Sequence, residues 1–594
     1  MKTLYAALVF VSISVIAFNC QKEVRTIGGN TQIPGNENNT ITSSPVTSTL
    51  QGNVFDETGK PAKDVSIKVG TVLTTTDDKG YFRVDNAQLD KNASLVTAVK
   101  TGYFKAYRSF SATNGVNQVM IRLIKKSSAG VIKSDAGGQI TLSNGSVINL
   151  PANGVIRAGS AYNGNVNVYA TYIDPVAAEI GERVPGSFIA KDKNNKLATL
   201  SSYGMLAVEL ESGTGEKLQL ANGSTATLTI PVPASIQSSA PSTLPLWYLD
   251  EQTGIWKEEG TAVKNGHAYT GTVKHFSYWN ADVSVPTVGF TATLKTPGGE
   301  PLTYTYVRFR AASGYVGNAY GVTDSLGQVS GFIPSNMTLV LEVLNSCHGI
   351  AYSQNVGPFT SAVNLGTITV NNSVSLITIK GKLTNCSNAV VTNGHALIRF
   401  DNIVHNVDAN SSGTFSLTLT ICSSAPATCE ITGYDDVAAQ QGSTTNVTVT
   451  SPVTDAGTIS ACGTSTVQYI NYTLDGANYS LSSTASDSLL AYTSTPGIVL
   501  PVKMWIMGSR NPGKYVNLTF GTNPGPGTYP MNGKMYINDY NRIGIIEPFN
   551  VVITSFPQTT GGYFEGSFTG QFKDSANLFV VHDINATFRL ARNW

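Results

Sequence analysis

The sequence predicts an all-β protein in which about five β-sandwich domains follow one another, and three observations support this prediction. The chain has 594 residues, too many for one core when a domain holds roughly 100–200. Charged residues make up only 13% of the chain, so few segments have the composition of a surface helix. Short stretches of alternating apolar residues, separated by turns rich in Gly, Asn and Asp, recur along most of its length.

The balance of charge excludes two broad classes of protein. Lys and Arg number 39 and Asp and Glu 38, which gives a formal net charge of +1. A nucleic-acid-binding protein needs a basic surface that this composition does not supply, so no nucleic acid is expected as a partner. A hydrophobic share of 41% also excludes a wholly disordered chain.

Residues 1–19 have the pattern of a secretory signal peptide. Lys2 supplies a basic start, an apolar run extends from Leu4 to Phe18, and Cys20 follows where the run ends. The run is too short to span a bilayer comfortably. Residues 20–48 are rich in Gly, Asn, Thr, Ser and Pro, and we expect them to form a flexible tether.

The position of Cys20 resembles that of the lipidated cysteine in bacterial lipoproteins. Ala17 and Asn19 depart from the usual Leu and the usual Gly, Ala or Ser, but looser signals of this kind occur in Bacteroidota. In that group a short charged stretch such as residues 21–23 directs the protein to the cell surface. The resemblance implies an acylated Cys20, with the membrane as partner and the surface of the outer membrane as location. The alternative is an ordinary secretory signal followed by an incidental cysteine.

Residues 49–126 carry the clearest β pattern. Val65, Ile67 and Val69 alternate as on a strand with one buried face. A turn from Asp77 to Gly80 then leads to Phe82, which we expect in the core. The segment resembles the carboxypeptidase regulatory-like domain. The resemblance implies a seven-stranded sandwich of the transthyretin or immunoglobulin-like class and a non-catalytic role.

The same pattern recurs in residues 286–372 and, more weakly, in residues 375–463. Each segment has an Asp-containing turn that ends in glycine, Gly327 or Gly413, and each closes with the sequence Gly-Thr-Ile. The repetition argues for duplication of one module. Each turn offers only one or two carboxylates, fewer than a calcium loop needs, so we expect no metal there.

Residues 128–283 form a different unit. It is similar to a β domain of Bacteroidota surface lipoproteins and to domains of animal extracellular matrix and receptor proteins. Trp247 and Trp256 flank an expected hairpin turn within it. Two interpretations stand: the rings pack in the core, as large aromatic residues of strands usually do, or they stack on a sugar ligand.

Residues 464–594 resemble the C-terminal β-sandwich units of uncharacterised Bacteroidota lipoproteins. Tyr479 follows an expected Asp-Gly hairpin turn, and Trp505 lies further along. Both residues join Trp247 and Trp256 as candidates for glycan stacking if the protein binds sugar.

Five cysteines remain after Cys20, an odd number, so at most two disulfides form. Four of them lie in residues 375–463, enough for two bridges within that module: Cys386, Cys422, Cys429 and Cys462. Cys386 and Cys462 are expected near one pole of the sandwich, but all three pairings remain open. Export to an oxidising compartment makes such bridges chemically accessible.

No motif of catalysis is present. The six histidines include no metal pair at helical spacing, and the sequence lacks a nucleophile elbow, a phosphate loop and a dinucleotide fingerprint. We therefore expect no enzyme, no cofactor and no metal. The leading hypothesis is a string of sandwiches that acts as a cell-surface scaffold or adhesion protein toward a protein or glycan partner. Two alternatives remain: a glycan-binding component of a surface uptake system, and a hydrolase with a site assembled across strands of residues 128–283 or 464–594.

Overall fold

The structure is a computed structural model that describes residues 41–315, 317–371, 376–422, 427–483, 487–493, 502–510, 514–523, 525–538, 540, 543–557, 562–574 and 577–592. The expected signal peptide and Cys20 lie outside these described residues. The regular secondary structure of the described chain is almost entirely β-strand, which confirms the all-β prediction, and its helical elements are α1 (Ile180–Arg183) and a 3-10 segment (Ala234–Ser239). Neither helical element of this part of the chain is long and apolar enough to cross a membrane.

Domain 1 is a seven-stranded sandwich. One sheet has the order β4-β1-β7 and the other the order β3-β2-β5-β6. Alternation buries Ile67 and Val69 and leaves Lys68 exposed between them. Phe82 is buried as expected and lies against Gly52, where a Cβ would meet the Phe82 ring at 2.5 Å. The strands of domain 1 are β1 (Pro45–Phe55), β2 (Ser66–Val69), β3 (Val72–Thr75), β4 (Tyr81–Asp90), β5 (Ser94–Val99), β6 (Ala106–Phe110) and β7 (Asn117–Arg122).

The first strand begins before the expected end of the tether. β1 starts at Pro45, inside the segment 20–48, and pairs with the far end of β4. The Asp90 carboxylate also accepts hydrogen bonds from Ser43 Oγ at 2.6 Å and from the Ser44 backbone N–H at 2.8 Å. Residues 43–48 are therefore part of domain 1 and not of a free linker.

The three segments interpreted as repeats share one topology. In domain 3 the sheets run β24-β21-β27 and β23-β22-β25-β26, and in domain 4 they run β31-β28-β35 and β30-β29-β32-β33-β36, with β34 beside β32. In each domain the first strand pairs in parallel with the last: β1 with β7, β21 with β27, and β28 with β35. The strands of domain 3 are β21 (Tyr278–Lys295), β22 (Tyr306–Ala311), β23 (Ala319–Val322), β24 (Gln328–Pro334), β25 (Leu339–Leu344), β26 (Ile350–Val356) and β27 (Val363–Thr369). Those of domain 4 are β28 (Leu376–Thr384), β29 (Gly394–Phe400), β30 (Ile403–Asp408), β31 (Thr414–Thr420), β32 (Ala427–Asp435), β33 (Gln440–Gly442), β34 (Thr445–Val449), β35 (Val453–Ser460) and β36 (Gly463–Ser465).

One side-chain oxygen holds the same turn in each repeat. Asp77 Oδ1 accepts the backbone N–H groups of residues 79 and 81, and Asp324 Oδ1 accepts those of residues 326 and 328. In domain 4 the acceptor is Asn410 Oδ1, which binds the N–H groups of residues 412 and 414. These are local bonds in which an Asx side chain satisfies its own turn, so they have no need of a cation.

Domain 2 has no linker to domain 3. β21 pairs with β15 of domain 2 as far as Pro286 and with β24 of domain 3 from Thr287 onward. The expected boundary at 283–286 therefore falls inside one continuous strand. The other elements of domain 2, besides the two helical ones, are β8 (Ser128–Lys133), β9 (Gly138–Thr141), β10 (Val147–Leu150), β11 (Val155–Arg157), β12 (Ser160–Ala161), β13 (Asn165–Ile173), β14 (Ile189–Lys191), β15 (Leu197–Glu211), β16 (Lys217–Leu220), β17 (Ala226–Pro231), β18 (Thr243–Asp250), β19 (Ile255–Asn265) and β20 (Ala268–Val273).

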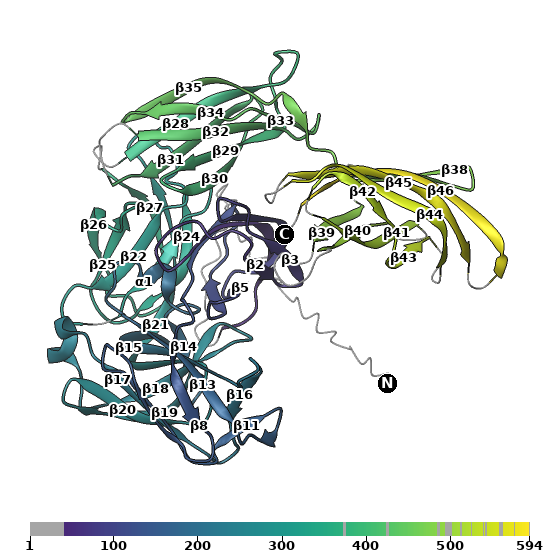
Figure 1. The fold of residues 1–594 in the computed structure, drawn as a ribbon. Helices are drawn as coiled ribbons and strands as arrows, with labels where there is room; N and C mark the ends of the chain where they lie inside the picture. The colour runs from purple at the N-terminus through teal and green to yellow at the C-terminus, as the bar shows by residue number, and fades with distance from the viewer. Residues whose placement is uncertain are drawn as a thin grey trace, which may run out of the picture.

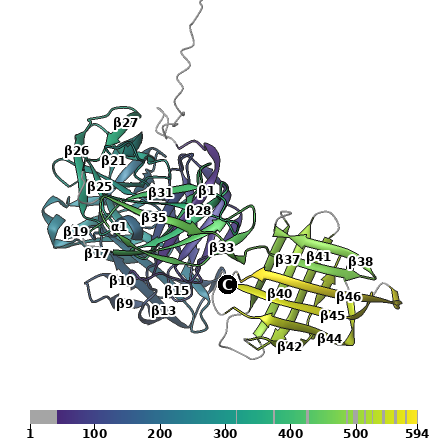
Figure 2. The ribbon, with the colours of Figure 1, turned by 90° about the horizontal axis from the view of Figure 1, so that it is seen from above.

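Domain 5 is a separate sandwich with its own core. Its sheets run β38-β37-β46-β45-β44-β42 and β39-β40-β41-β43, and they share no strand with the other domains. Phe549, Phe564 and Phe568 are fully buried between the sheets. Figure 2 shows domain 5 set to one side of the other four. Its strands are β37 (Tyr469–Leu474), β38 (Ala477–Ser482), β39 (Ser488–Thr493), β40 (Val502–Arg510), β41 (Lys514–Thr522), β42 (Gly527–Pro530), β43 (Met535–Ile537), β44 (Ile543–Ser555), β45 (Tyr563–Asp574) and β46 (Asn577–Ala591).

Domains 1 to 4 do not form the expected string. Domain 1, purple in Figure 1, lies among the other three and bonds to each of them. Ser109 Oγ donates to the Gly254 carbonyl of domain 2 at 2.6 Å. Thr113 Oγ1 donates to Asp324 of domain 3 at 2.7 Å, and Asn53 Nδ2 donates to the Val404 carbonyl of domain 4 at 3.0 Å. The predicted tandem β-sandwiches are present, but the first four pack together and do not extend as a string, because buried polar contacts join domains far apart in the sequence.

Candidate functional site

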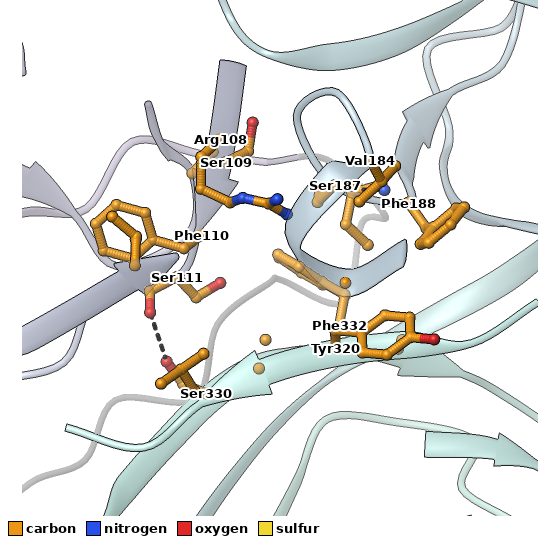
Figure 3. Close-up of a pocket in the computed structure, with 18 of the residues that line it drawn as sticks. Arg108, Ser109, Phe110, Ser111, Val184, Ser187, Phe188, Tyr320, Ser330 and Phe332 are labelled. Atoms are coloured by element: carbon orange, nitrogen blue, oxygen red, sulfur yellow. Dashed lines mark hydrogen bonds between the residues drawn. The ribbon is translucent and has the colours of Figure 1, made fainter. Parts of the chain in front are cut away.

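A cavity of about 100 Å³ lies where domains 1, 2 and 3 meet. Its walls come from β6 and β7 of domain 1, from α1 and the segment after it in domain 2, and from β23 and β24 of domain 3 (Figure 3). The cavity exists only because the three domains are packed together, so it is a product of the domain arrangement. Sites between domains are a common place for small ligands.

An arginine side chain reaches into this cavity. Arg108 lies on β6, the edge strand of its sheet, which continues through backbone hydrogen bonds to Gly186 of domain 2. The side chain is only 9% exposed. Arg108 NH1 donates to the Gly186 carbonyl at 3.5 Å, and Nε has no hydrogen-bond partner. Burial lowers the pKa of this guanidinium below its usual value, because desolvation disfavours the charged form.

The nearby carboxylate of Glu182 is already paired. Glu182, on α1, is 6% exposed and lies 3.3 Å from Arg122 NH2 of domain 1. Its other oxygen lies 2.9 Å from His348 Nε2 of domain 3. Arg122 therefore balances the charge of Glu182, and Arg108 forms no ion pair with any described carboxylate. The junction thus holds one buried cation, Arg108, that no described carboxylate contacts, while the buried Glu182 is paired with the half-buried Arg122.

The rest of the lining is mainly apolar and aromatic. Figure 3 shows Val184, Phe188 and Phe332 on the side toward which the Arg108 guanidinium points, and Phe110 on the other side of Arg108. On the wall opposite, Ser330 Oγ donates to the Ser111 carbonyl at 3.4 Å. A second orphan donor is present, because Gln118 Nε2 has no partner although its Oε1 accepts from Gln51. The described lining includes no Asp, Glu, His, Lys or Cys, so it offers a cationic donor but no general base.

The two tryptophans proposed for sugar stacking are buried. Trp247 and Trp256 are both 0% exposed. Trp247 Nε1 donates to the Asp282 carbonyl at 3.1 Å, and Trp256 Nε1 donates to the Ser187 carbonyl at 2.7 Å. Stacking of a sugar on either ring was a wrong interpretation, and packing was the right one, because both faces of each indole are covered by protein and the N–H is satisfied internally.

The structure places Tyr479 and Trp505 in different sheets of domain 5. Tyr479, on β38, is half-buried and stacks on Tyr472, with ring centroids 4.9 Å apart and an interplanar angle of 9°. Trp505 is half-buried on β40, between β39 and β41. The two rings therefore do not belong to one platform.

The disulfides differ from the set taken from the sequence. Cys386 and Cys462 form a bridge within domain 4, with Cα atoms 4.8 Å apart. Cys422 pairs instead with Cys347 of domain 3, with Cα atoms 5.4 Å apart, so this bridge joins two domains. Cys429 is the buried free thiol, and burial raises its pKa to about 11. The sequence predicted at most two bridges with one thiol left over, which is what the structure has, but the set of four candidate cysteines omitted Cys347 because only bridges within one module were considered.

Within the part of the chain that the structure describes, no group of three or more His, Cys, Asp or Glu side chains lies together. His582 Nδ1 and Asp475 Oδ2 form a pair at 2.7 Å in domain 5, with Phe572 and Tyr540 packed on the imidazole. The pair closes a turn, since Asp475 Oδ1 also accepts the backbone N–H of Asp583.

Comparison with known proteins gives local likenesses. No family model matches the chain. A stretch of 156 residues is 30% identical to cartilage intermediate layer protein 2 of Mus musculus, and a stretch of 121 residues is 31% identical to the same protein of Homo sapiens. These matches cover 25% and 20% of this chain, but only 13% and 10% of the relatives' own length.

Among solved structures, the shaft pilin SpaA of Lactobacillus rhamnosus GG is 11% identical and has a TM-score of 0.16. The match covers 30% of this chain and 98% of the pilin. A TM-score this low does not establish a shared architecture.

Proposed function

We propose that the protein is a non-catalytic lipoprotein of the outer membrane, exposed at the cell surface, in which domains 1 to 4 form a rigid scaffold for contact with a partner. Cys20 carries the lipid, and the residues between Cys20 and domain 1 form a short tether. The partner is a protein or a glycan that meets the outer faces of the sandwiches.

The observation that carries this proposal is the fixed arrangement of the four domains. A continuous strand joins domains 2 and 3, the bridge between Cys347 and Cys422 joins domains 3 and 4, and domain 1 bonds to all three. Rigid spacing of surfaces is what a scaffold needs, whereas uptake of a polymer into a cleft needs an open groove. Two disulfides also favour an oxidising compartment outside the cytoplasm.

The chemistry of the junction supports a role in binding over one in catalysis. The cavity offers Arg108 and the hydroxyls of serine and tyrosine residues, but its described lining has no carboxylate, imidazole or thiol that could activate a hydroxyl. Acyl, glycosyl or phosphoryl transfer each needs a nucleophile or a base placed against the reacting atom. The hydrolase hypothesis therefore receives no support from the cavity that the domains enclose.

The curated relatives agree with an extracellular role. The name of these relatives, cartilage intermediate layer protein 2, refers to cartilage. The shared stretch is short, so this likeness supports the setting of the protein and not a particular partner.

Two measurements on cells that make the full chain test the proposal. Mass spectrometry of the mature N-terminal peptide is expected to find a diacylglycerol thioether on Cys20. Protease added to intact cells is expected to remove domain 5 epitopes. The Cys20→Ala variant serves as the control and is expected to lose both the lipid and the membrane fraction. An unmodified Cys20, or a wild-type protein that behaves as soluble periplasmic material, would overturn the proposal.

A further inference from the structure

We propose that the cavity at the junction of domains 1, 2 and 3 binds a small organic anion: a monocarboxylate with a short apolar chain. Arg108 holds the carboxylate and the aromatic wall receives the chain. This inference concerns a ligand site and does not depend on lipidation or on the location of the protein.

The first argument is charge. A buried arginine without an anionic partner is rare, because its desolvation is compensated by nothing nearby. Glu182 attracts Arg108 through space but forms no ion pair with it, since Arg122 and His348 already occupy both of its oxygens. A bound monoanion would give Arg108 the direct anionic partner that it lacks.

The second argument is the pair of unused donors. Arg108 Nε and Gln118 Nε2 have no hydrogen-bond partner, and both side chains are more than nine-tenths buried. Figure 3 shows the guanidinium of Arg108 directed into the space between the domains. The planar guanidinium presents parallel N–H groups that match the two oxygens of a carboxylate.

The third argument is the size and polarity of the space. A cavity of about 100 Å³ holds several water molecules or an organic ligand of a few non-hydrogen atoms. Phe110, Phe188 and Phe332 give it an apolar wall, which favours a hydrocarbon chain over a fully hydrated ion such as phosphate. Ser187 and Ile189 of the lining are only half-buried.

Binding at this place has a mechanical consequence. The ligand would contact three domains at once, and it would therefore bind the assembled form better than a form in which the domains have separated. A ligand with this preference raises the unfolding temperature, and the rise grows with the logarithm of its concentration once this exceeds Kd.

The test uses butyrate as the probe, its neutral isostere butyramide, and inorganic phosphate, each added to the purified full chain. Saturation-transfer NMR and calorimetry report binding, and the thermal midpoint reports stabilisation. Butyrate is expected to bind at micromolar to millimolar concentration and to raise the midpoint, while butyramide and phosphate do neither.

Arg108→Met is the informative variant, because methionine keeps much of the length and apolar stem of arginine. It is expected to weaken butyrate binding at least about tenfold. Its thermal midpoint without ligand is expected to stay equal or rise, since an unpaired buried charge is gone, and this shows that the variant folds. Arg157→Met is the matched control, because Arg157 lies on the surface of domain 2 in a pair with Glu216, and it should bind butyrate as the wild type does.

Three results would overturn the proposal. Equal binding of butyrate and butyramide would show that charge is not recognised. Unchanged binding by Arg108→Met would place the site elsewhere. Absence of binding for the linear and branched carboxylates of three to six carbons, or tighter binding of phosphate than of all of them, would reject the ligand class.

Discussion

The Asp324 carboxylate of domain 3 accepts a hydrogen bond from Thr113 Oγ1 of domain 1 at 2.7 Å, although 211 residues separate the two. The acceptor atom is Asp324 Oδ2, which also accepts the backbone N–H of Gly115 at 3.0 Å. The other oxygen, Oδ1, holds the turn of Asp324 itself through residues 326 and 328. The Asp324 side chain therefore stabilises the turn of its own domain and also binds domain 3 to domain 1.

Asp324→Asn is predicted to weaken this junction and leave the turn intact. The amide oxygen can replace Oδ1, but the amide nitrogen cannot accept from Thr113 or Gly115. A buried N–H left without a partner costs about 1–3 kcal/mol of unfolding free energy. Urea unfolding measures the loss, and hydrogen exchange at Gly115 locates it. Wild-type stability and wild-type protection at Gly115 would contradict this view of the junction.

Asp77→Asn is the matched variant at the equivalent turn of domain 1. It is expected to stabilise the protein at pH 7, whereas Asp324→Asn is expected to destabilise it. Burial raises the pKa of Asp77 to about 6, from 3.8 for the model compound. The folded state then binds more protons than the unfolded state between these pH values, so wild-type stability falls as pH rises from about 4 to 6. Asparagine carries no charge and already performs this role at position 410. The variant is expected to be about 1–2 kcal/mol more stable than the wild type at pH 7 and equal to it at pH 4. A variant less stable than the wild type at pH 7 would reject this prediction.

His405 is predicted to make the contact between domains 1, 3 and 4 sensitive to acid. Burial lowers its pKa to about 3, and its ring stacks on Tyr304 with centroids 5.5 Å apart. The unfolded state takes up a proton near pH 6.5 and the folded state does not, so stability falls as pH drops below about 6.5. His405→Phe keeps the aromatic stacking and removes the titrating group. Urea unfolding from pH 7 to 4 is expected to show a shallower decline for His405→Phe than for the wild type, by up to about 1.4 kcal/mol per pH unit. Parallel declines would contradict the assignment.

Removing the disulfide between Cys347 and Cys422 is predicted to loosen the contact between domains 3 and 4 away from the cysteines themselves. The double variant Cys347→Ser, Cys422→Ser removes a disulfide between residues that are 75 positions apart in the sequence. Its unfolding free energy is expected to fall by about 2–4 kcal/mol. Hydrogen exchange should rise at the contact between Thr303 and Thr418, where the Thr303 backbone N–H donates across the two domains at 3.1 Å. Cys386→Ser with Cys462→Ser is the comparison, since that bridge lies within domain 4 and should leave exchange at Thr303 unchanged. Equal exchange at Thr303 in all three proteins would show that the bridge does not hold the domains together.

Trp256→Ala separates packing from sugar binding. The side chain is fully buried, so its removal is expected to cost about 3–5 kcal/mol of unfolding free energy. Denaturant unfolding gives the change directly. Retained stability together with loss of retention on a glycan array would restore the stacking interpretation that the structure overturns.

The parts of the fold that depend on neighbouring residues were predictable. The turns at Asp77 and Asp324, the alternation around Ile67 and the burial of Phe82 all follow from local patterns of polarity and turn chemistry. The weaker third copy, domain 4, was also predictable from its sequence, although the residue that holds its turn is Asn410 and not Asp408.

The arrangement of the domains was not predictable in the same way. Ala106–Phe110 alternates like any strand, and nothing near it in sequence shows that its edge meets Gly186 or that Arg108 is enclosed. Glu182, Arg122 and His348 come from three domains and converge only after these pack. The cysteine count did not show the bridge between domains either. Domain 4 has four cysteines, an even number, and only the structure shows that Cys429 is free and that Cys422 needs a partner in domain 3.

The central claim is that domains 1 to 4 form one compact body around domain 1. Small-angle X-ray scattering of residues 41–468 tests it most directly, because domain 5 shares no sheet with them. A compact body of this length has a radius of gyration of about 22 Å, whereas four sandwiches in a line give about 40 Å. We predict a radius of gyration of about 22 Å and a distance distribution with a single peak. A radius of about 40 Å, with one peak for each spacing between domains, would show that the four domains are arranged in a line.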